Sequence, residues 1–241
     1  MSKSHILSYI LFSLFLLQAK AQNQEIKVLK KWIPESVISE TAVNEFSIDS
    51  CFVAIPISDE IFARMENKSY KKNCTIKRSS LRYLKVLHRN VNGKIQLGEI
   101  VCNASIANDL LEIFRKLYES NYKIERIALI DKYNADDETS MTANNTSCFN
   151  YRTISGSKVL SKHSQGLAID VNPLYNPCLH IRTGKVEPKT GKQYAAGREK
   201  LTNTKVNIIN KNDLCYRLFI QHGFKWGGAW TSVKDYQHFE K

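Results

Sequence analysis

Leu81-Arg-Tyr-Leu-Lys-Val-Leu87 is followed, across Asn92-Gly93, by Lys94-Ile-Gln-Leu-Gly-Glu-Ile-Val101, and this stretch decides the fold class. Both runs are rich in the β-branched, aromatic and apolar residues that favour strands. Asn-Gly tolerates the positive φ that a tight hairpin turn requires, so it is a strong signal between two such runs. The stretch therefore predicts two long antiparallel strands joined by a turn.

Outward from this hairpin, strands and helices alternate irregularly. Apolar runs at residues 51–57 and 124–130 predict further strands. Apolar residues recur at helical spacing over 106–117 and again over 214–219, where Gly223 is placed to end the second helix. Because no regular strand-helix-strand alternation accompanies these elements, an α+β fold is favoured over a parallel sheet.

The N-terminus carries the pattern of a secretory signal peptide. An apolar run over 6–17 follows Lys3 and ends at Ala19-Lys20-Ala21, a small-x-small cleavage pattern. We expect residues 1–21 to be removed before Gln22, which makes the protein exported, periplasmic or secreted, with no transmembrane span in the mature form. A retained N-terminal anchor is the alternative. Residues 22–54 are polar and without clear periodicity, and are predicted to be an N-terminal leader segment ahead of one domain over 55–241.

Composition narrows the class of protein. The chain has 241 residues, 43% of them hydrophobic and 24% charged, which is typical of a globular protein and excludes wholesale disorder. The formal net charge is +12, but the basic residues are scattered. An anionic surface such as cell-wall polymer or lipid headgroups is therefore expected, and nucleic acid is not. The six cysteines form no C-x-x-C pair, which makes a cysteine zinc knuckle unexpected and permits up to three disulfides.

The most informative motif for chemistry is Ser161-Lys-His-Ser-Gln-Gly-Leu-Ala-Ile-Asp170. Its end alternates as a strand does, which turns Asp170 away from the apolar side chains and toward a cleft. Gly166 lets the chain turn before the strand, so His163 can fold back beside Asp170. An imidazole and a carboxylate placed in this way are a credible pair of zinc ligands. A loop hydrogen bond for His163 and a turn cap for Asp170 are the structural alternatives.

The C-terminal segment supplies the remaining groups. His238 can be a third ligand, which completes a shell of two histidines and one carboxylate with a position left for water. Asp235 lies three residues earlier, so a helical turn would place both side chains on one face, where Asp235 could accept a proton from water. We expect Trp226 and Trp230 to pack in the core. Three other histidines have no comparable carboxylate context and are expected to be ordinary surface or core residues: His88, His180 and His222.

The motif S-x-H-x-x-G-x-A-x-D, followed later by D-x-x-H, resembles the zinc D-alanyl-D-alanine carboxypeptidase and dipeptidase family of M15-type peptidases. The branch it most resembles contains cell-wall carboxypeptidases and L-alanyl-D-glutamate endopeptidases, and the likeness runs from about residue 55 to the C-terminus. The sequence departs from the family at Cys178, where an aromatic residue is expected. Further segments share the likeness: Asp136-Asp137, Ser140-Met141, Asn144 to Ser147, Phe149 to Arg152, Asn172-Pro173 and Trp226 to Gly228.

The resemblance implies a zinc peptidase domain over 55–241, with a small antiparallel sheet flanked by helices. It assigns three zinc ligands: His163, Asp170 and His238. It further implies that Asp235 is the catalytic acid-base, that Arg152 holds the scissile carbonyl or a substrate carboxylate, and that Ser161 helps to fix the substrate.

The implied function is hydrolysis of amide bonds in peptidoglycan stem peptides by metal-activated water, carried out by a monomer. Both D-Ala-D-Ala carboxypeptidase and L-Ala-D-Glu endopeptidase activity remain open. A catalytically inactive cell-wall-binding module of the same fold is the alternative.

Overall fold

The computed structural model describes residues 19–154, 157–198 and 207–241. The predicted signal peptide therefore lies almost entirely outside the described residues. A helix over 19–31 opens the described chain, and within the described ranges no helix is long and apolar enough to cross a membrane. The other α-helices are α2 (Glu40–Phe46), α3 (Asp59–Met65), α4 (Ala107–Glu119), α5 (Asp137–Thr142), α6 (Lys192–Ala195) and α7 (Leu214–Gln221).

The largest sheet has four antiparallel strands in the order β1-β4-β3-β2. The predicted hairpin forms its centre as β3 (Leu81–Arg89) and β4 (Ile95–Asn103), and Gly93 takes a φ of +77° in the turn. The strand predicted over 51–57 is shorter, as β2 (Val53–Ile55), because a 3-10 turn occupies the residues before it. The antiparallel sheet with helices around it confirms the α+β class.

The first strand of this sheet comes from the segment predicted as a leader. β1 (Val37–Ile38) pairs with β4, and Leu29, Trp32 and Val43 from the same segment are buried in the core. The Trp32 indole nitrogen donates a hydrogen bond to the carbonyl oxygen of Gly98 in β4, at 3.0 Å. Residues 22–54 therefore fold as part of the main body and share its hydrophobic core.

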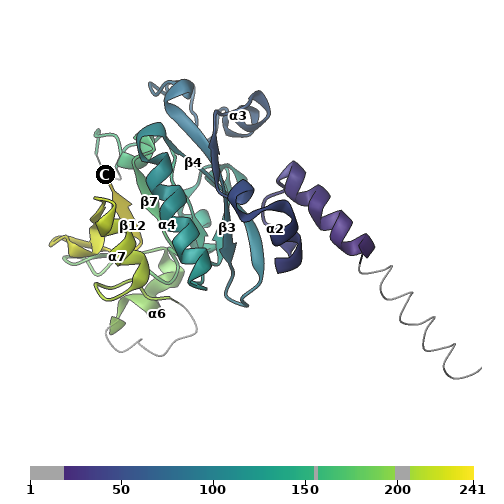
Figure 1. The fold of residues 1–241 in the computed structure, drawn as a ribbon. Coiled ribbons are helices and arrows are strands. Elements are labelled where there is room, and N and C mark those ends of the chain that lie inside the picture. The colour runs from purple at the N-terminus through teal and green to yellow at the C-terminus, as the bar shows by residue number, and fades with distance from the viewer. Residues whose placement is uncertain (1–18, 155–156, 199–206) are drawn as a thin grey trace, which may run out of the picture.

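Helix α4 joins this sheet to the C-terminal part of the chain. It packs against β3 on one side and against α7 on the other, as Figure 1 shows. Its buried side chains recur at the spacing that the sequence predicts, and include Leu110, Phe114 and Leu117. Helix α7 ends at Gln221, and Gly223 just beyond it has a φ of +80°, which fits its predicted role at the helix end.

Two short three-stranded sheets organise the C-terminal part. One has the order β10-β12-β7, with β10 (Lys225–Trp226), β12 (His238–Glu240) and β7 (Ala168–Asp170). The other has the order β11-β8-β9, with β11 (Val233–Asp235), β8 (Cys178–His180) and β9 (Val186–Glu187). Both are antiparallel. The chain passes from one sheet to the other through the turn between β11 and β12.

One strand prediction is only partly correct. The run over 124–130 forms a two-residue strand, β5 (Arg126–Ile127), which pairs in parallel with β6 (Asn145–Thr146). A 3-10 turn begins at Ile130 and ends the extended conformation, so the apolar residues there are buried in a turn and not in a strand.

Candidate functional site

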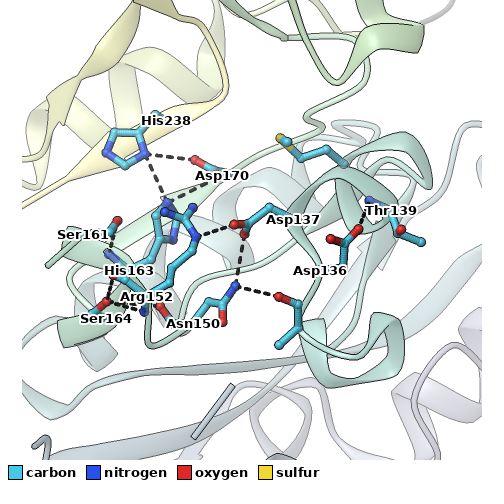
Figure 2. Close-up of polar contacts among 12 residues, drawn as sticks. Asp136, Asp137, Thr139, Asn150, Arg152, Ser161, His163, Ser164, Asp170 and His238 are labelled. Atoms are coloured by element: carbon cyan, nitrogen blue, oxygen red, sulfur yellow. Dashed lines mark hydrogen bonds and ion pairs between the residues drawn. The ribbon is translucent and has the colours of Figure 1, made fainter. Parts of the chain in front are cut away.

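Three side chains from separate elements, His163, Asp170 and His238, meet in one cluster (Figure 2). His238 Nδ1 lies 3.0 Å from Asp170 Oδ1, and His163 Nε2 lies 3.3 Å from Asp170 Oδ2. The two rings approach each other at 3.2 Å between His163 Nε2 and His238 Nδ1. One nitrogen of each ring and the carboxylate thus face a common point.

The turn that carries His163 is shaped by its flanking residues. His163 lies in a 3-10 turn over Lys162–Gln165, and the Ser161 hydroxyl caps it by accepting a hydrogen bond from the His163 backbone nitrogen at 3.2 Å. Gly166 ends the turn with a φ of +67°. A Cβ there would lie 2.6 Å from the backbone nitrogen of Asn103, so both the conformation and the close approach require glycine.

Strand pairing places the other two members. Asp170 ends β7 and His238 begins β12, and the two residues are direct partners in the antiparallel register. Directly opposed residues project their side chains to the same face of a sheet. The His238 ring and the Asp170 carboxylate therefore meet because of the backbone pairing itself.

Each histidine ring is held by its other nitrogen. His163 Nδ1 donates to the carbonyl oxygen of Cys148 at 2.7 Å, and His238 Nε2 lies 3.2 Å from the Glu240 carboxylate. Such outer partners fix the ring orientation and the tautomer of metal-binding histidines. With these nitrogens engaged, His163 Nε2 and His238 Nδ1 are left facing Asp170.

The carboxylates of Asp170 and Glu240 favour positive charge at the cluster, either as a proton on His238 or as a bound cation that replaces it. Burial alone would raise the pKa of Asp170, but His163 and His238 hold it well below its usual range. Burial opposes a charge on His238, but hydrogen bonds to Asp170 and Glu240 outweigh it and raise the pKa of His238 to about 10. A set of two imidazole nitrogens and one carboxylate is a donor set that suits Zn²⁺. The residues therefore fit the metal that the sequence implies.

Asp235 lies beside this cluster but reaches it differently from the prediction. It ends strand β11, and Tyr236 and Gln237 form a tight turn to β12, so the expected helical turn is wrong. The Trp226 indole nitrogen donates to the Tyr236 carbonyl at 2.9 Å and holds the turn. Gly227 fits against it closely, since a Cβ there would lie 2.9 Å from Asp235 Cβ.

Asp235 has the environment of a group that exchanges protons. Its Oδ1 atom is buried and finds no hydrogen-bond partner among the described residues. Burial raises the pKa of Asp235 to about 6, while His238 opposes this shift and Asp170 adds to it. A carboxylate with an unpaired oxygen and a pKa near neutrality is suited to accept and return a proton.

Arg152 is anchored close to the histidine turn. Its backbone nitrogen donates to the Ser164 hydroxyl at 2.8 Å, and its carbonyl accepts from the Ser161 backbone nitrogen at 3.1 Å. The side chain reaches Asp137 and forms an ion pair with it, as Figure 2 shows. Asp137 is itself held by Asn150, whose side-chain nitrogen donates to it at 3.1 Å. The guanidinium is thus positioned by an acidic partner while part of it stays exposed.

Three features of the site were not predicted from the sequence. Glu240 lies two residues after His238 on the same strand, so strand alternation could have placed it on the same face. The Cys148 contact is made by a backbone carbonyl, which no residue pattern reveals. Trp230, expected to pack in the core, is 37% exposed, and its ring centroid lies 5.3 Å from that of His238. Trp226 is buried as expected.

Comparison with known proteins supports a peptidase. A family model described as D-alanyl-D-alanine carboxypeptidase matches residues 155–241, the part that contains His163, Asp170, Asp235 and His238. Searches of curated proteins and of solved structures found no match. The family match supports the peptidase family that the sequence resembles, and indicates a peptidase of the kind that acts on cell-wall peptides.

Proposed function

We propose that the protein is an exported zinc-dependent peptidase that hydrolyses amide bonds in peptidoglycan stem peptides. The observation that carries this proposal is the convergence of His163 Nε2, Asp170 and His238 Nδ1, beside the buried Asp235 carboxylate, whose Oδ1 has no hydrogen-bond partner among the described residues. The family match over the same residues supports it. A binding module without turnover would have no need of a buried Asp235 with a partnerless Oδ1 and a raised pKa, so the hydrolytic alternative is favoured.

The zinc ligands are His163, Asp170 and His238. Zinc, when bound, supplies a Lewis acid that polarises the scissile carbonyl and lowers the pKa of water to about 7. The hydrogen bonds from His163 to the Cys148 carbonyl and from His238 to Glu240 keep the rings in the orientation that binding needs.

The reaction further needs a group that moves a proton. Asp235 accepts the proton of the attacking water at a carboxylate oxygen and passes it to the leaving amine. Its burial supports this role, because a carboxylate with a raised pKa is a stronger base and accepts the proton of water more readily than a solvated one. The tight turn held by Trp226 keeps Asp235 next to His238 through both transfers.

In this proposal Arg152 and Ser161 bind the substrate. The Arg152 guanidinium can donate two parallel hydrogen bonds to a substrate carboxylate or to the developing oxyanion. Its ion pair with Asp137 limits the rotamers available to it and so prepares it for binding. Ser161 also caps the histidine turn, so its hydroxyl is tied to the backbone of the proposed ligand His163. Removal of residues 1–21 would take away Lys3 and Lys20 and leave a net charge of +10 (12 − 2), which favours approach to an anionic cell wall.

Mass spectrometry of purified muropeptides incubated with the zinc-loaded protein tests the proposal. The expected result is release of a terminal D-alanine or cleavage between L-alanine and D-glutamate, lost on chelation and restored by zinc. Asp170→Asn should abolish cleavage, whereas Asp59→Asn, the same chemical change on the exposed start of α3, should not. Intact stem peptides after incubation with folded, zinc-loaded protein would overturn the proposal.

A further inference from the structure

A second cluster of metal-binding side chains lies on the β8–β9 hairpin. Cys178 and His180 come from β8 and Glu187 from β9, and one donor atom of each lies within 4.8 Å of the others. His180 Nε2 is 2.6 Å from Glu187 Oε2 and 4.0 Å from Cys178 Sγ. The three donors therefore converge on one face of the hairpin.

The pairing of the strands places the three side chains on one face. Cys178 and His180 are two residues apart on β8, so they project to the same face. Cys178 is the direct antiparallel partner of Glu187 on one side and of Asp235 on the other. The cluster is thus built on paired backbone, and its cysteine is the cross-strand neighbour of the candidate acid-base.

The exposure of the three side chains suits entry of an ion from solvent. Cys178 is buried at the inner end, while the His180 side chain is 34% exposed and that of Glu187 is 26% exposed. Lys185 Nζ binds Glu187 Oε1 at 2.6 Å, which leaves Oε2 directed at His180. An ion can therefore reach the buried sulfur from the open side of the hairpin.

The donor chemistry selects the kind of ion. Sulfur, imidazole nitrogen and carboxylate oxygen together suit a borderline-soft divalent cation such as zinc, and hard cations such as calcium or magnesium prefer oxygen alone. We propose that Cys178, His180 and Glu187 form a second binding site for a zinc-like divalent cation, separate from His163, Asp170 and His238 and adjoining the candidate active site through Asp235. Water completes the coordination shell on the exposed side.

This cluster is a feature of this chain and not of the resemblance. Cys178 stands where an aromatic residue is expected, and the local sequence predicts no carboxylate partner for His180. Glu187 becomes its neighbour only because the turn around Gly184 folds β9 back on β8. Binding there requires no turnover, so it is measurable whether or not the protein hydrolyses stem peptides.

Titration of the full chain with Cd²⁺, followed by ultraviolet absorption, tests the proposal. Cadmium bound to a thiolate gives a charge-transfer band, which the sulfur-free cluster of His163, Asp170 and His238 cannot produce. The chain has six free cysteines, so loss of the band in Cys178→Ser is what assigns it to Cys178. We expect the band in the wild-type protein and in His163→Ala, and its loss in Cys178→Ser. Cys74→Ser is the matched control, because Cys74 is partly exposed and lies outside the cluster; it should keep the band.

Variants of the other two ligands keep the proposal testable if Cys178→Ser folds poorly. His180→Gln and Glu187→Gln change partly exposed side chains, and each should weaken cadmium binding by more than the roughly 10- to 100-fold that loss of an outer-shell partner costs. Equilibrium dialysis should show a second ion bound to the wild-type chain. A wild-type protein without the band, a band that survives in Cys178→Ser, or unchanged affinity in His180→Gln would overturn the proposal.

Discussion

Asp170 and His238 are directly opposed in the antiparallel pairing of β7 with β12, and their side chains approach at 3.0 Å. The register of these two three-residue strands therefore sets the geometry of the candidate metal site. A slip of one residue would turn His238 to the opposite face of the sheet. The stacked rings of Phe219 and Phe239 pack beside this pairing and oppose such a slip, since Phe239 is fully buried.

Replacement of a ligand should remove the metal. We expect the wild-type protein to carry about one tightly bound zinc ion at the candidate active site. His238→Ala should lower both the zinc content and the hydrolytic rate, because the remaining His163 and Asp170 leave the site with too few donors. Elemental analysis after dialysis measures the content. Full activity of a zinc-free His238→Ala protein would contradict the ligand assignment.

Asp235→Asn should separate metal binding from turnover. The amide nearly preserves the size of the carboxylate but cannot accept a proton, so the rate should fall by roughly 10²- to 10⁴-fold while zinc is retained. Steady-state kinetics and zinc content are measured on the same sample, with Asp59→Asn as the control. Loss of zinc in Asp235→Asn would instead make Asp235 a ligand or a structural support.

Glu240→Gln should weaken zinc binding without removing a ligand. Glu240 holds His238 by the nitrogen that faces away from Asp170, and loss of such an outer partner costs roughly 10- to 100-fold in metal affinity. Competition with a chelator of known affinity measures the change. At saturating zinc the rate should return toward the wild-type value. Glu119→Gln, on the surface of α4, is the matched control and should leave zinc affinity unchanged.

Arg152→Lys tests the role of the guanidinium fork. Lysine keeps the positive charge but cannot form two parallel hydrogen bonds, so kcat/KM should fall by roughly ten- to a hundredfold. Zinc content and thermal stability should stay close to those of the wild type. If the lysine variant cleaves a stem peptide as well as the wild type does, Arg152 supplies only general positive charge.

His88 should make the protein sensitive to acid. Burial lowers the pKa of His88 from 6.5 to about 4, although a hydrogen bond to the Ile124 carbonyl opposes this shift. Between these values the unfolded chain binds a proton that the folded chain does not, so stability falls as the pH falls from 6.5 toward 4. Over this pH range the free energy of unfolding decreases by on the order of 3 kcal/mol. Denaturant titrations at several pH values should show a flatter dependence in His88→Leu, and an unchanged dependence would contradict the assignment.

Elements with a strong local signal could be predicted from the sequence. The hairpin β3–β4, helix α4 and helix α7 each combine a clear apolar period with a turn or end signal, and all three are present. The two-residue strand β1 could not be recognised, because a pair of residues shows no period, and β5 fills only part of the strand predicted over 124–130. Their conformation is set by long-range pairing, of β1 with β4 and of β5 with β6.

In the candidate site, too, the contacts set by local sequence could be predicted and those set by long-range pairing could not. His163 and Asp170 could be paired from sequence because Gly166 separates them by one turn, and Gly166 does take the left-handed conformation. The path from Asp235 to His238 was predicted as helical, since a spacing of three residues fits a helical face as well as a tight turn. The partnership of Glu187 with Cys178 and His180 depends on strand register, which the local sequence does not reveal.

The contact between Gly166 and Asn103 sets a limit on how the protein can be dissected. Asn103 ends β4 and its backbone nitrogen donates to the Gly166 carbonyl at 2.9 Å, while the His163 ring is held by the Cys148 carbonyl. Both partners precede residue 155, where the family match begins. A fragment of residues 155–241 would contain all the proposed ligands but not the supports that orient them. If the proposed site binds a metal, we expect binding to require the folded hairpin, so that metal uptake during refolding would report assembly of the whole chain.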